Sequence, residues 1–388
     1  MMGKTVRVVL VGIGGYGEVY LSPLLDDPEG EGCEIVGAVD PSPENCSRLA
    51  DLEALGVPVH STLEDFYGSD SADLAVISSP IQLHTPQVCR ALEAGSHVLV
   101  EKPAAGCLAD IDTMIEARSR AGRFVSVGFQ WTFSESILAL KEDILAGRFG
   151  APLSGRPLTL WPRTESYYGR NDWAGRRKDS EGRWILDSPA NNAMAHHIHN
   201  LLFLLGPEID RSAEPRDVYT RVTRVNDIET FDSVAARIGT DSGVELLFLA
   251  SHTIALEETL DPRFRLEFES ASVEFKGGRG PITARFDGGE VVEYASPDAT
   301  SQVAKLWLCV NAVHHAVAIP CVLETARPHT AFIEAVDRSM GTPQRFPESA
   351  IRISDTDGGR LRWVEGLADT FRKSYETGDW PELPGGGS

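Results

Sequence analysis

The sequence contains no run of apolar residues near the roughly 18 that a membrane-spanning helix requires. Its first residues lack the apolar core and cleavage site of a secretion signal. The six cysteines are scattered without a Cys-x-x-Cys pair, which argues against a disulfide framework or a thiolate zinc site. Basic residues are few, 36 against 57 acidic ones, and the net charge of −21 repels nucleic acids and anionic lipids. We therefore expect a soluble, cytoplasmic protein that binds neither nucleic acid nor membrane.

The first 130 of the 388 residues alternate strand-like and helix-like segments. Short runs rich in Val, Ile and Leu are expected to be strands at 6–11, 34–39, 72–77, 97–100 and 123–127. Helical segments of about ten residues separate them, which predicts right-handed βαβ units and a doubly wound parallel sheet of the α/β class. We expect residues 1–130 to form this sheet and its helices as a separate domain.

The pattern changes after residue 130. Successive strands with turn residues between them, over about 215–295, predict a large open sheet that is mostly antiparallel. Helical segments at about 136–146, 193–205, 302–318 and 330–340 accompany it. We expect residues 131–375 to form a second domain of the α+β class, followed by a tail at 376–388.

A glycine-rich turn follows the first strand and opens a helix. It reads Gly12-Ile13-Gly14-Gly15-Tyr16-Gly17, which fits the GxGxxG pattern in which glycines permit close approach to a pyrophosphate at a helix N-terminus. The second strand ends at Asp40, where a carboxylate can bind the ribose hydroxyls and repel a 2′-phosphate. This combination predicts that residues 1–130 are a Rossmann domain that binds a dinucleotide, and it favours NAD over NADP. A simple turn-capping role is the alternative for Asp40.

Two further strands end in polar residues, Ser78-Ser79-Pro80 and Glu101-Lys102-Pro103. The carboxyl ends of parallel strands form the crevice where open α/β sheets bind ligands, so we expect cofactor contacts from both segments. For Lys102 a solvated loop position is the alternative.

Three histidines lie within four positions in the segment Asn191–Asn200. On a helix, His196 shares a face with Asn192 and with His199. No carboxylate accompanies them in a metal-binding spacing, so no metal is expected. A histidine that acts as general acid or base beside a substrate pocket fits better, since imidazole titrates near neutral pH. Packing at a domain interface is the alternative for one or two of the three.

Aromatic and basic residues alternate between Trp161 and Trp184. Flat rings beside hydrogen-bond donors suit a sugar, although a loop anchored by its aromatic side chains would show the same pattern. We expect substrate contacts from Trp131, Tyr168, Trp173, Arg177 and His199.

Together these features resemble the Gfo/Idh/MocA oxidoreductases (glucose–fructose oxidoreductase, inositol dehydrogenase and MocA) over nearly the whole length. The resemblance rests on the glycine turn, Asp40, Ser79-Pro80 with His84 shortly after, Glu101-Lys102-Pro103, and the helix that ends at Leu205-Gly206. It implies a cofactor contact from His84 and a homodimer or homotetramer formed through the second sheet. It also implies that Lys102 and His196 act on a hydroxyl group, and it places Asn192 where the family has an aspartate.

The expected function is NAD-dependent hydride transfer to or from a secondary hydroxyl of a sugar, sugar derivative or inositol. Lys102, His196 and Asn192 are the candidate catalytic residues, and the sequence leaves open whether Lys102 or His196 is the base. Two alternatives are an NAD-using glycoside-cleaving enzyme of the same family and a non-catalytic NAD-binding regulatory subunit.

Overall fold

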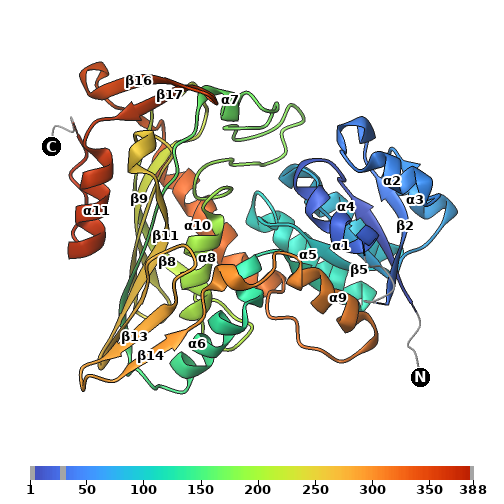
Figure 1. Cartoon of the computed structure of the whole chain (residues 1–388), viewed down its shortest axis with the longest axis horizontal. Coiled ribbons are helices and arrows are strands. Elements are labelled where there is room, and N and C mark those ends of the chain that lie inside the picture. Colours follow the sequence, from blue (N-terminus) through green and yellow to red (C-terminus); the bar gives the residue numbers. More distant parts are fainter. Residues whose placement is uncertain (1–4, 27–31, 385–388) are drawn as a thin grey trace. The chain divides into compact units, whose positions relative to one another are not determined.

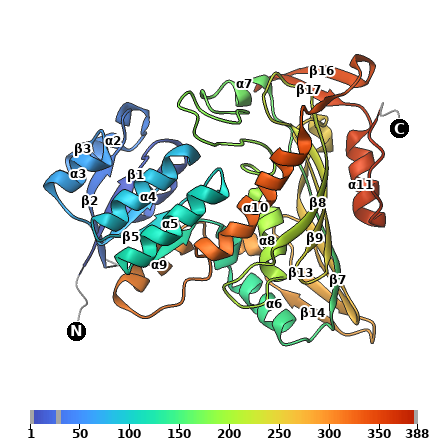
Figure 2. The same ribbon diagram turned by 180° about the vertical axis from the view of Figure 1, so that it is seen from behind.

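The computed structural model describes residues 5–26 and 32–384, which form two compact units (Figures 1 and 2). The first unit extends to Phe133 and also includes Thr300–Arg327, and the second contains Ser134–Ala299 and the chain from Pro328 onward. We call Thr300–Arg327 the return segment. It belongs to the first unit, although it lies within the range 131–375 that was predicted to form the second domain.

The first unit contains a six-stranded parallel sheet in the order β3-β2-β1-β4-β5-β6. The strand order reverses between β1 and β4, and at such a point open α/β sheets form a ligand crevice beyond the carboxyl ends of the strands. The predicted α/β fold class is confirmed, and β3 is a short strand that the sequence pattern did not reveal. The strands are β1 (Val6–Val11), β2 (Cys33–Val39), β3 (Val59–His60), β4 (Leu74–Ile77), β5 (His97–Val100) and β6 (Val125–Val127).

Helices cover both faces of this sheet because its side chains are apolar on both sides. Val8 and Leu10 of β1 share one buried cluster with Leu21 of α1 and Leu306 of α9. The return segment therefore contributes a helix to the same face as α1, which explains why it belongs with the first unit. The helices of this unit are α1 (Glu18–Asp26), α2 (Leu49–Ala54), α3 (Leu63–Ser69), α4 (His84–Glu93), α5 (Leu108–Ala121) and α9 (Ala304–His314).

The second unit is built on a nine-stranded sheet in the order β14-β13-β12-β11-β7-β10-β9-β8-β15. Neighbouring strands are antiparallel except for the parallel pairs β7–β10 and β8–β15. The predicted, largely antiparallel sheet is thus present, with β7 before the region where strands were expected. Its strands are β7 (Pro152–Leu160), β8 (Pro215–Arg224), β9 (Ser233–Thr240), β10 (Glu245–Ser251), β11 (Leu260–Phe268), β12 (Ala271–Phe275), β13 (Ile282–Phe286), β14 (Val291–Tyr294) and β15 (Gln344–Arg345).

This sheet is covered on both faces near its centre (Figures 1 and 2). On one face, Thr159 of β7 bonds to α8 and Phe248 of β10 packs edge-on against Phe332 of α10. On the other face, β7 and β10 contribute to a cluster with Phe371 of α11. Helix α11 therefore covers part of the sheet through which oligomer contacts are predicted, and the oligomeric state stays a prediction. The remaining elements are α6 (Glu135–Leu145), α7 (Glu165–Tyr168), α8 (Ala195–Leu204), α10 (Leu323–Met340), α11 (Leu367–Thr377) and the hairpin of β16 (Ile351–Thr356) and β17 (Gly359–Val364).

None of the helices in residues 5–26 and 32–384 combines the length and apolar character needed to cross a membrane.

Candidate active site

The glycine turn after β1 is packed so closely that two of its glycines cannot be replaced without displacement. A Cβ atom on Gly17 would lie 1.8 Å from the carbonyl oxygen of Gly12. A Cβ on Gly12, whose φ is +79°, would lie 2.8 Å from the backbone nitrogen of Ser79. Because Gly12 and Gly17 have no side chains, the turn can pack directly against the end of β4. This contact lies between β1 and β4, where the strand order of the sheet reverses.

Asp40, directly after β2, holds this turn from the other side. Its Oδ2 accepts hydrogen bonds from the backbone N–H groups of Ile13 at 3.0 Å and Gly14 at 3.4 Å. Its Oδ1 accepts from the N–H of Ser42 at 2.9 Å. The structure thus shows the turn-bracing role that was one of the two interpretations of Asp40. Binding of the ribose hydroxyls stays a prediction.

His84 links the two polar loops that follow β4 and β5. Its Nε2 lies 2.8 Å from the carbonyl oxygen of Ser79, and its Nδ1 lies 3.0 Å from that of Pro103. The ring is buried, and burial lowers the pKa of His84, so the neutral form is favoured. Since a neutral imidazole has one N–H, it donates to only one of these carbonyls at a time. His84 therefore joins the loops from inside the domain, and a direct contact with a cofactor stays a prediction.

A buried ion pair lies beneath the Glu101-Lys102-Pro103 segment. Lys305 of α9 is fully buried and donates to the carboxylate of Glu101, which also accepts from the hydroxyl of Tyr20. The backbone N–H of Lys102 donates to the other carboxylate oxygen at 3.1 Å, and the ammonium of Lys305 reaches the hydroxyl of Tyr16 at 3.3 Å. The cluster therefore connects the glycine turn with the loop that carries Lys102.

The charge of Lys305 is stabilised by its surroundings. Burial by itself lowers the pKa of an ammonium group, but the nearby Glu101 carboxylate and Tyr16 outweigh burial and raise the pKa of Lys305 above its ordinary value. Neither Lys305 nor Tyr20 belongs to a motif that the sequence pattern singles out. The sequence did carry one signal for Lys305, because it is the single charged residue in the apolar run Ala304-Lys305-Leu306-Trp307-Leu308. A charge that is buried with such a run requires a partner of opposite charge.

The first unit fits a bound dinucleotide. The turn of Gly12 and Gly17 presents bare backbone at the N-terminal end of α1, where free N–H groups attract phosphate. The hydroxyl of Ser78 beside this turn is buried and has no hydrogen-bond partner in the described structure. A buried hydroxyl without a partner is unfavourable, and a bound phosphate or ribose would satisfy it.

In the second unit, Asn192 lies against a carboxylate. Its Nδ2 donates to Oδ1 of Asp187 at 2.8 Å. The other oxygen of Asp187, Oδ2, accepts from the N–H of Gly175 at 2.6 Å and lies 4.0 Å from the guanidinium of Arg170. Asp187 is 4% exposed. A carboxyl group therefore lies beside Asn192, the position where the resemblance expects an aspartate.

The histidines of α8 differ in environment. His196 is half-buried, whereas His197 is buried and its Nδ1 lies 2.9 Å from the hydroxyl of Thr159. His199 is 1% exposed, and its ring stacks on Phe203 within the second unit. Burial, with the nearby positive charges of His329 and Lys141, holds the pKa of His199 well below its usual range. These surroundings are those of a core residue, so a substrate contact by His199 would require rearrangement.

The other predicted substrate residues are also held by neighbouring groups. Trp131, in the first unit, is 4% exposed. In the second unit the hydroxyl of Tyr168 lies 3.1 Å from Nδ1 of His252, and the guanidinium of Arg177 pairs with Asp337 at 2.7 Å. The guanidinium of Arg170 lies 5.0 Å from the ring centre of Trp173. Their contacts with substrate stay predictions.

No group of three or more His, Cys, Asp or Glu side chains suited to a metal ion occurs in the described part of the chain.

Comparisons with known proteins agree with this architecture. Residues 6–129 match the family described as the GFO_IDH_MocA oxidoreductase family, NAD-binding Rossmann fold. A 1-carboxy-3-chloro-3,4-dihydroxycyclohexa-1,5-diene dehydrogenase from Comamonas testosteroni is 34% identical over 37% of this chain and 35% of its own. Inositol 2-dehydrogenase 3 from Saccharopolyspora erythraea is 31% identical over 47% of this chain and 54% of its own. The chain thus spans about half or less of these relatives.

A solved structure extends the likeness to both units. This structure is the WlbA dehydrogenase from Bordetella pertussis in complex with NADH and UDP-GlcNAcA. Its comparison with the present structure gives a TM-score of 0.70, and the matched residues make up 87% of this chain and 96% of the WlbA chain. Its sequence identity is 22%, so this likeness concerns the fold. The first unit thus has the Rossmann fold of the NAD-binding family model that residues 6–129 match. The predicted resemblance to the Gfo/Idh/MocA oxidoreductases is confirmed for residues 6–129.

Proposed function

We propose that this protein is an NAD-dependent oxidoreductase that acts on a secondary hydroxyl, or the corresponding ketone, of a sugar, sugar derivative or inositol. The observation that supports it most directly is the arrangement at the carboxyl ends of β1, β4 and β5. There the close-packed turn of Gly12 and Gly17 and the loop of Lys102 belong to one hydrogen-bonded framework, through Glu101 and Lys305. A lysine beside a dinucleotide turn is placed for proton transfer during hydride transfer.

In this mechanism the glycine turn, Asp40 and Ser78 hold NAD, which accepts or donates the hydride when bound. Lys102 or His196 takes the hydroxyl proton during oxidation and returns it during reduction. A positioned base contributes about 10²–10⁴-fold to the rate. Asn192 orients the substrate hydroxyl, and its hydrogen bond to Asp187 fixes the direction of its amide.

Preference for NAD follows from Asp40 at the end of β2. Its carboxylate repels a 2′-phosphate, and the next residues, Pro41, Ser42 and Pro43, include no arginine to bind one. Replacement by Asp40→Ser with Pro41→Arg is expected to shift preference toward NADP. Comparable kcat/KM values of the wild type with both cofactors would contradict the assignment.

A panel of sugars, sugar acids and inositols, assayed with NAD and NADP by NADH or NADPH formation, tests the proposal. We expect turnover with NAD on at least one polyol, and a loss of about 10²–10⁴-fold in kcat for Lys102→Ala with unchanged NADH affinity. Lys276→Ala, which removes an exposed lysine that is 3.5 Å from Glu274, is the matched control. His196→Ala is expected to lower kcat if His196 is the base, and mainly to raise KM if it orients the hydroxyl.

Two outcomes would contradict the proposal. Release of a sugar from a glycoside without net NADH formation would indicate the glycoside-cleaving alternative. Tight binding of NAD with no turnover across the panel would indicate a regulatory subunit.

A further inference from the structure

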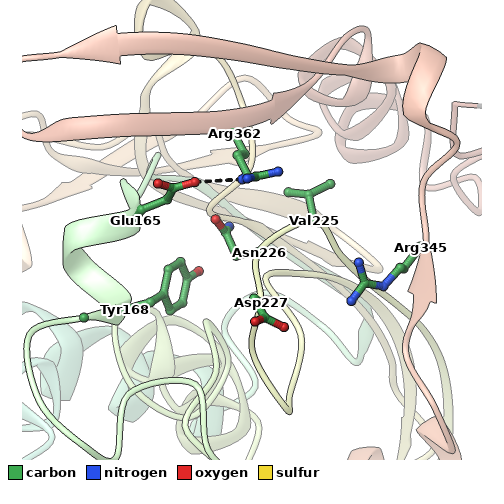
Figure 3. Close-up of a pocket in the computed structure, with 8 residues that line it drawn as sticks. Glu165, Tyr168, Val225, Asn226, Asp227, Arg345 and Arg362 are labelled. Atoms are coloured by element: carbon green, nitrogen blue, oxygen red, sulfur yellow. Dashed lines mark hydrogen bonds and ion pairs between the residues drawn. The ribbon is translucent and has the colours of Figure 1, made fainter.

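The second unit contains a pocket of about 450 Å³ that the proposed mechanism does not use. Segments distant in sequence meet around it: helix α7, the loop between β8 and β9, strand β15 and strand β17 (Figure 3). Its lining side chains are mostly polar, with two arginines, two carboxylates, one amide and one tyrosine ring. The pocket lies wholly within one unit, so it depends on that unit alone.

The pocket wall offers hydrogen-bond acceptors that lack partners. Asn226 is 3% exposed, and its Nδ2 donates to Oδ2 of Asp232 at 3.0 Å. This bond fixes the amide, and its Oδ1 is buried with no hydrogen-bond partner among residues 5–26 and 32–384. The adjacent Asp227 makes no ion pair within the described residues. Both groups accept hydrogen bonds from hydroxyl groups, so they favour a ligand that carries hydroxyls.

The pocket also offers one guanidinium that is not neutralised. Nε of Arg362 donates to Oε1 of Glu165 at 2.9 Å, so these two charges compensate each other (Figure 3). Arg345 extends into the pocket from β15 and forms no ion pair with any described residue (Figure 3). A guanidinium presents paired donors that match a carboxylate or a phosphate.

Since Asp227 and Arg345 do not neutralise each other, a ligand with both hydroxyl donors and an oxyanion suits the pocket better than a simple anion. We propose that this pocket binds a hydroxylated small molecule with an anionic group, such as a sugar acid or a sugar phosphate. Arg345 binds the oxyanion, Asn226 and Asp227 accept from hydroxyls, and the ring of Tyr168 contacts the C–H face of the ligand. This binding goes beyond the proposed hydride transfer, because it needs no nicotinamide cofactor.

Isothermal titration calorimetry on the full chain without nucleotide tests the proposal. The probes are D-glucuronate and D-galacturonate as carboxylates, D-glucose 6-phosphate and D-glucose 1-phosphate as phosphates, and D-glucose and inorganic phosphate as controls. We expect at least one anionic sugar to bind at least ten times more tightly than both controls. The tighter of the two anionic classes then identifies the oxyanion.

Arg345→Gln is expected to weaken binding of that sugar by about 10- to 100-fold, the loss typical of a charge-assisted hydrogen bond. Arg345 is exposed, so this change should leave the fold intact. Arg360→Gln removes the same charge from an exposed position of β17 outside the pocket, and is expected to keep wild-type affinity. The proposal is overturned if no anionic sugar exceeds the controls, or if Arg345→Gln and Arg360→Gln behave alike. Because no cofactor is present, these results are independent of whether the protein catalyses hydride transfer.

Discussion

Replacement of Lys305 by methionine is the sharpest test of the framework that joins the glycine turn to the Lys102 loop. Lys305 is fully buried and Glu101 is 6% exposed, so Lys305→Met leaves an uncompensated carboxylate in the interior. Removing one partner of a buried ion pair costs about 3–5 kcal/mol. At roughly 2–4 °C per kcal/mol for a domain of this size, the melting temperature should fall by about 6–20 °C.

Differential scanning calorimetry at pH 7 measures this change. Arg120→Met is the matched control in the same unit, because Arg120 forms an exposed pair with Glu116 at 3.8 Å. Exposed pairs contribute about 0–1 kcal/mol, so its melting temperature should fall by at most about 4 °C. The double variant with Glu101→Gln removes both charges and should recover part of the loss.

The pH dependence has a defined sign. The pKa of Lys305 is raised in the folded protein, so its contribution is complete below the unfolded value of about 10.4 and is lost as the pH rises through the folded value. A Lys305→Met variant that melts within about 4 °C of wild type at pH 7, or a double variant less stable than the sum of the single changes, would refute the reasoning.

Three further predictions concern other parts of the molecule. Gly17→Ala should lower the free energy of unfolding by about 1–3 kcal/mol in calorimetry. Gly14→Ala is the control, because its added Cβ would make only ordinary contacts of 3.7 Å or more, and its stability should remain near wild type. Equal effects of the two changes would contradict the packing argument. Burial raises the pKa of Asp232 to about 6 against the hydrogen bonds from Val225 and Asn226, so its contribution to stability falls as the pH rises from about 4 to 6. In urea unfolding, Asp232→Asn should therefore gain about 2 kcal/mol relative to wild type between about pH 4.5 and 7.5, and a constant difference would contradict this. Asn192→Asp puts a second carboxylate where the amide of Asn192 now lies 2.8 Å from Asp187. Because two carboxylates at this distance repel each other, the melting temperature should fall. An unchanged melting temperature would indicate that this contact is absent in solution.

Much of the first unit could be predicted from the sequence because its signals are local. Strands buried on both faces appear as continuous runs of Val, Ile and Leu, and the glycine turn is written in consecutive residues from Gly12 to Gly17. The short strand β3 gave no such signal, since its two residues are only partly buried. The return of α9 to the first unit was equally hidden, because an apolar helix face does not specify which sheet it will cover.

The sequence by itself determined the fold class, the dinucleotide turn and the residues that follow each parallel strand, because a short-range pattern of side-chain size and polarity encodes them. Only the tertiary structure decided which distant groups meet. It paired Lys305 with Glu101 across 204 positions and brought Asp187 against Asn192. It also placed Arg345 at a pocket, where no carboxylate of the described part of the chain pairs with it. It also placed His199 in the core, although its helical spacing allowed a position beside His196. Burial and charge compensation depend on the whole packed chain, and for that reason no local pattern determines them.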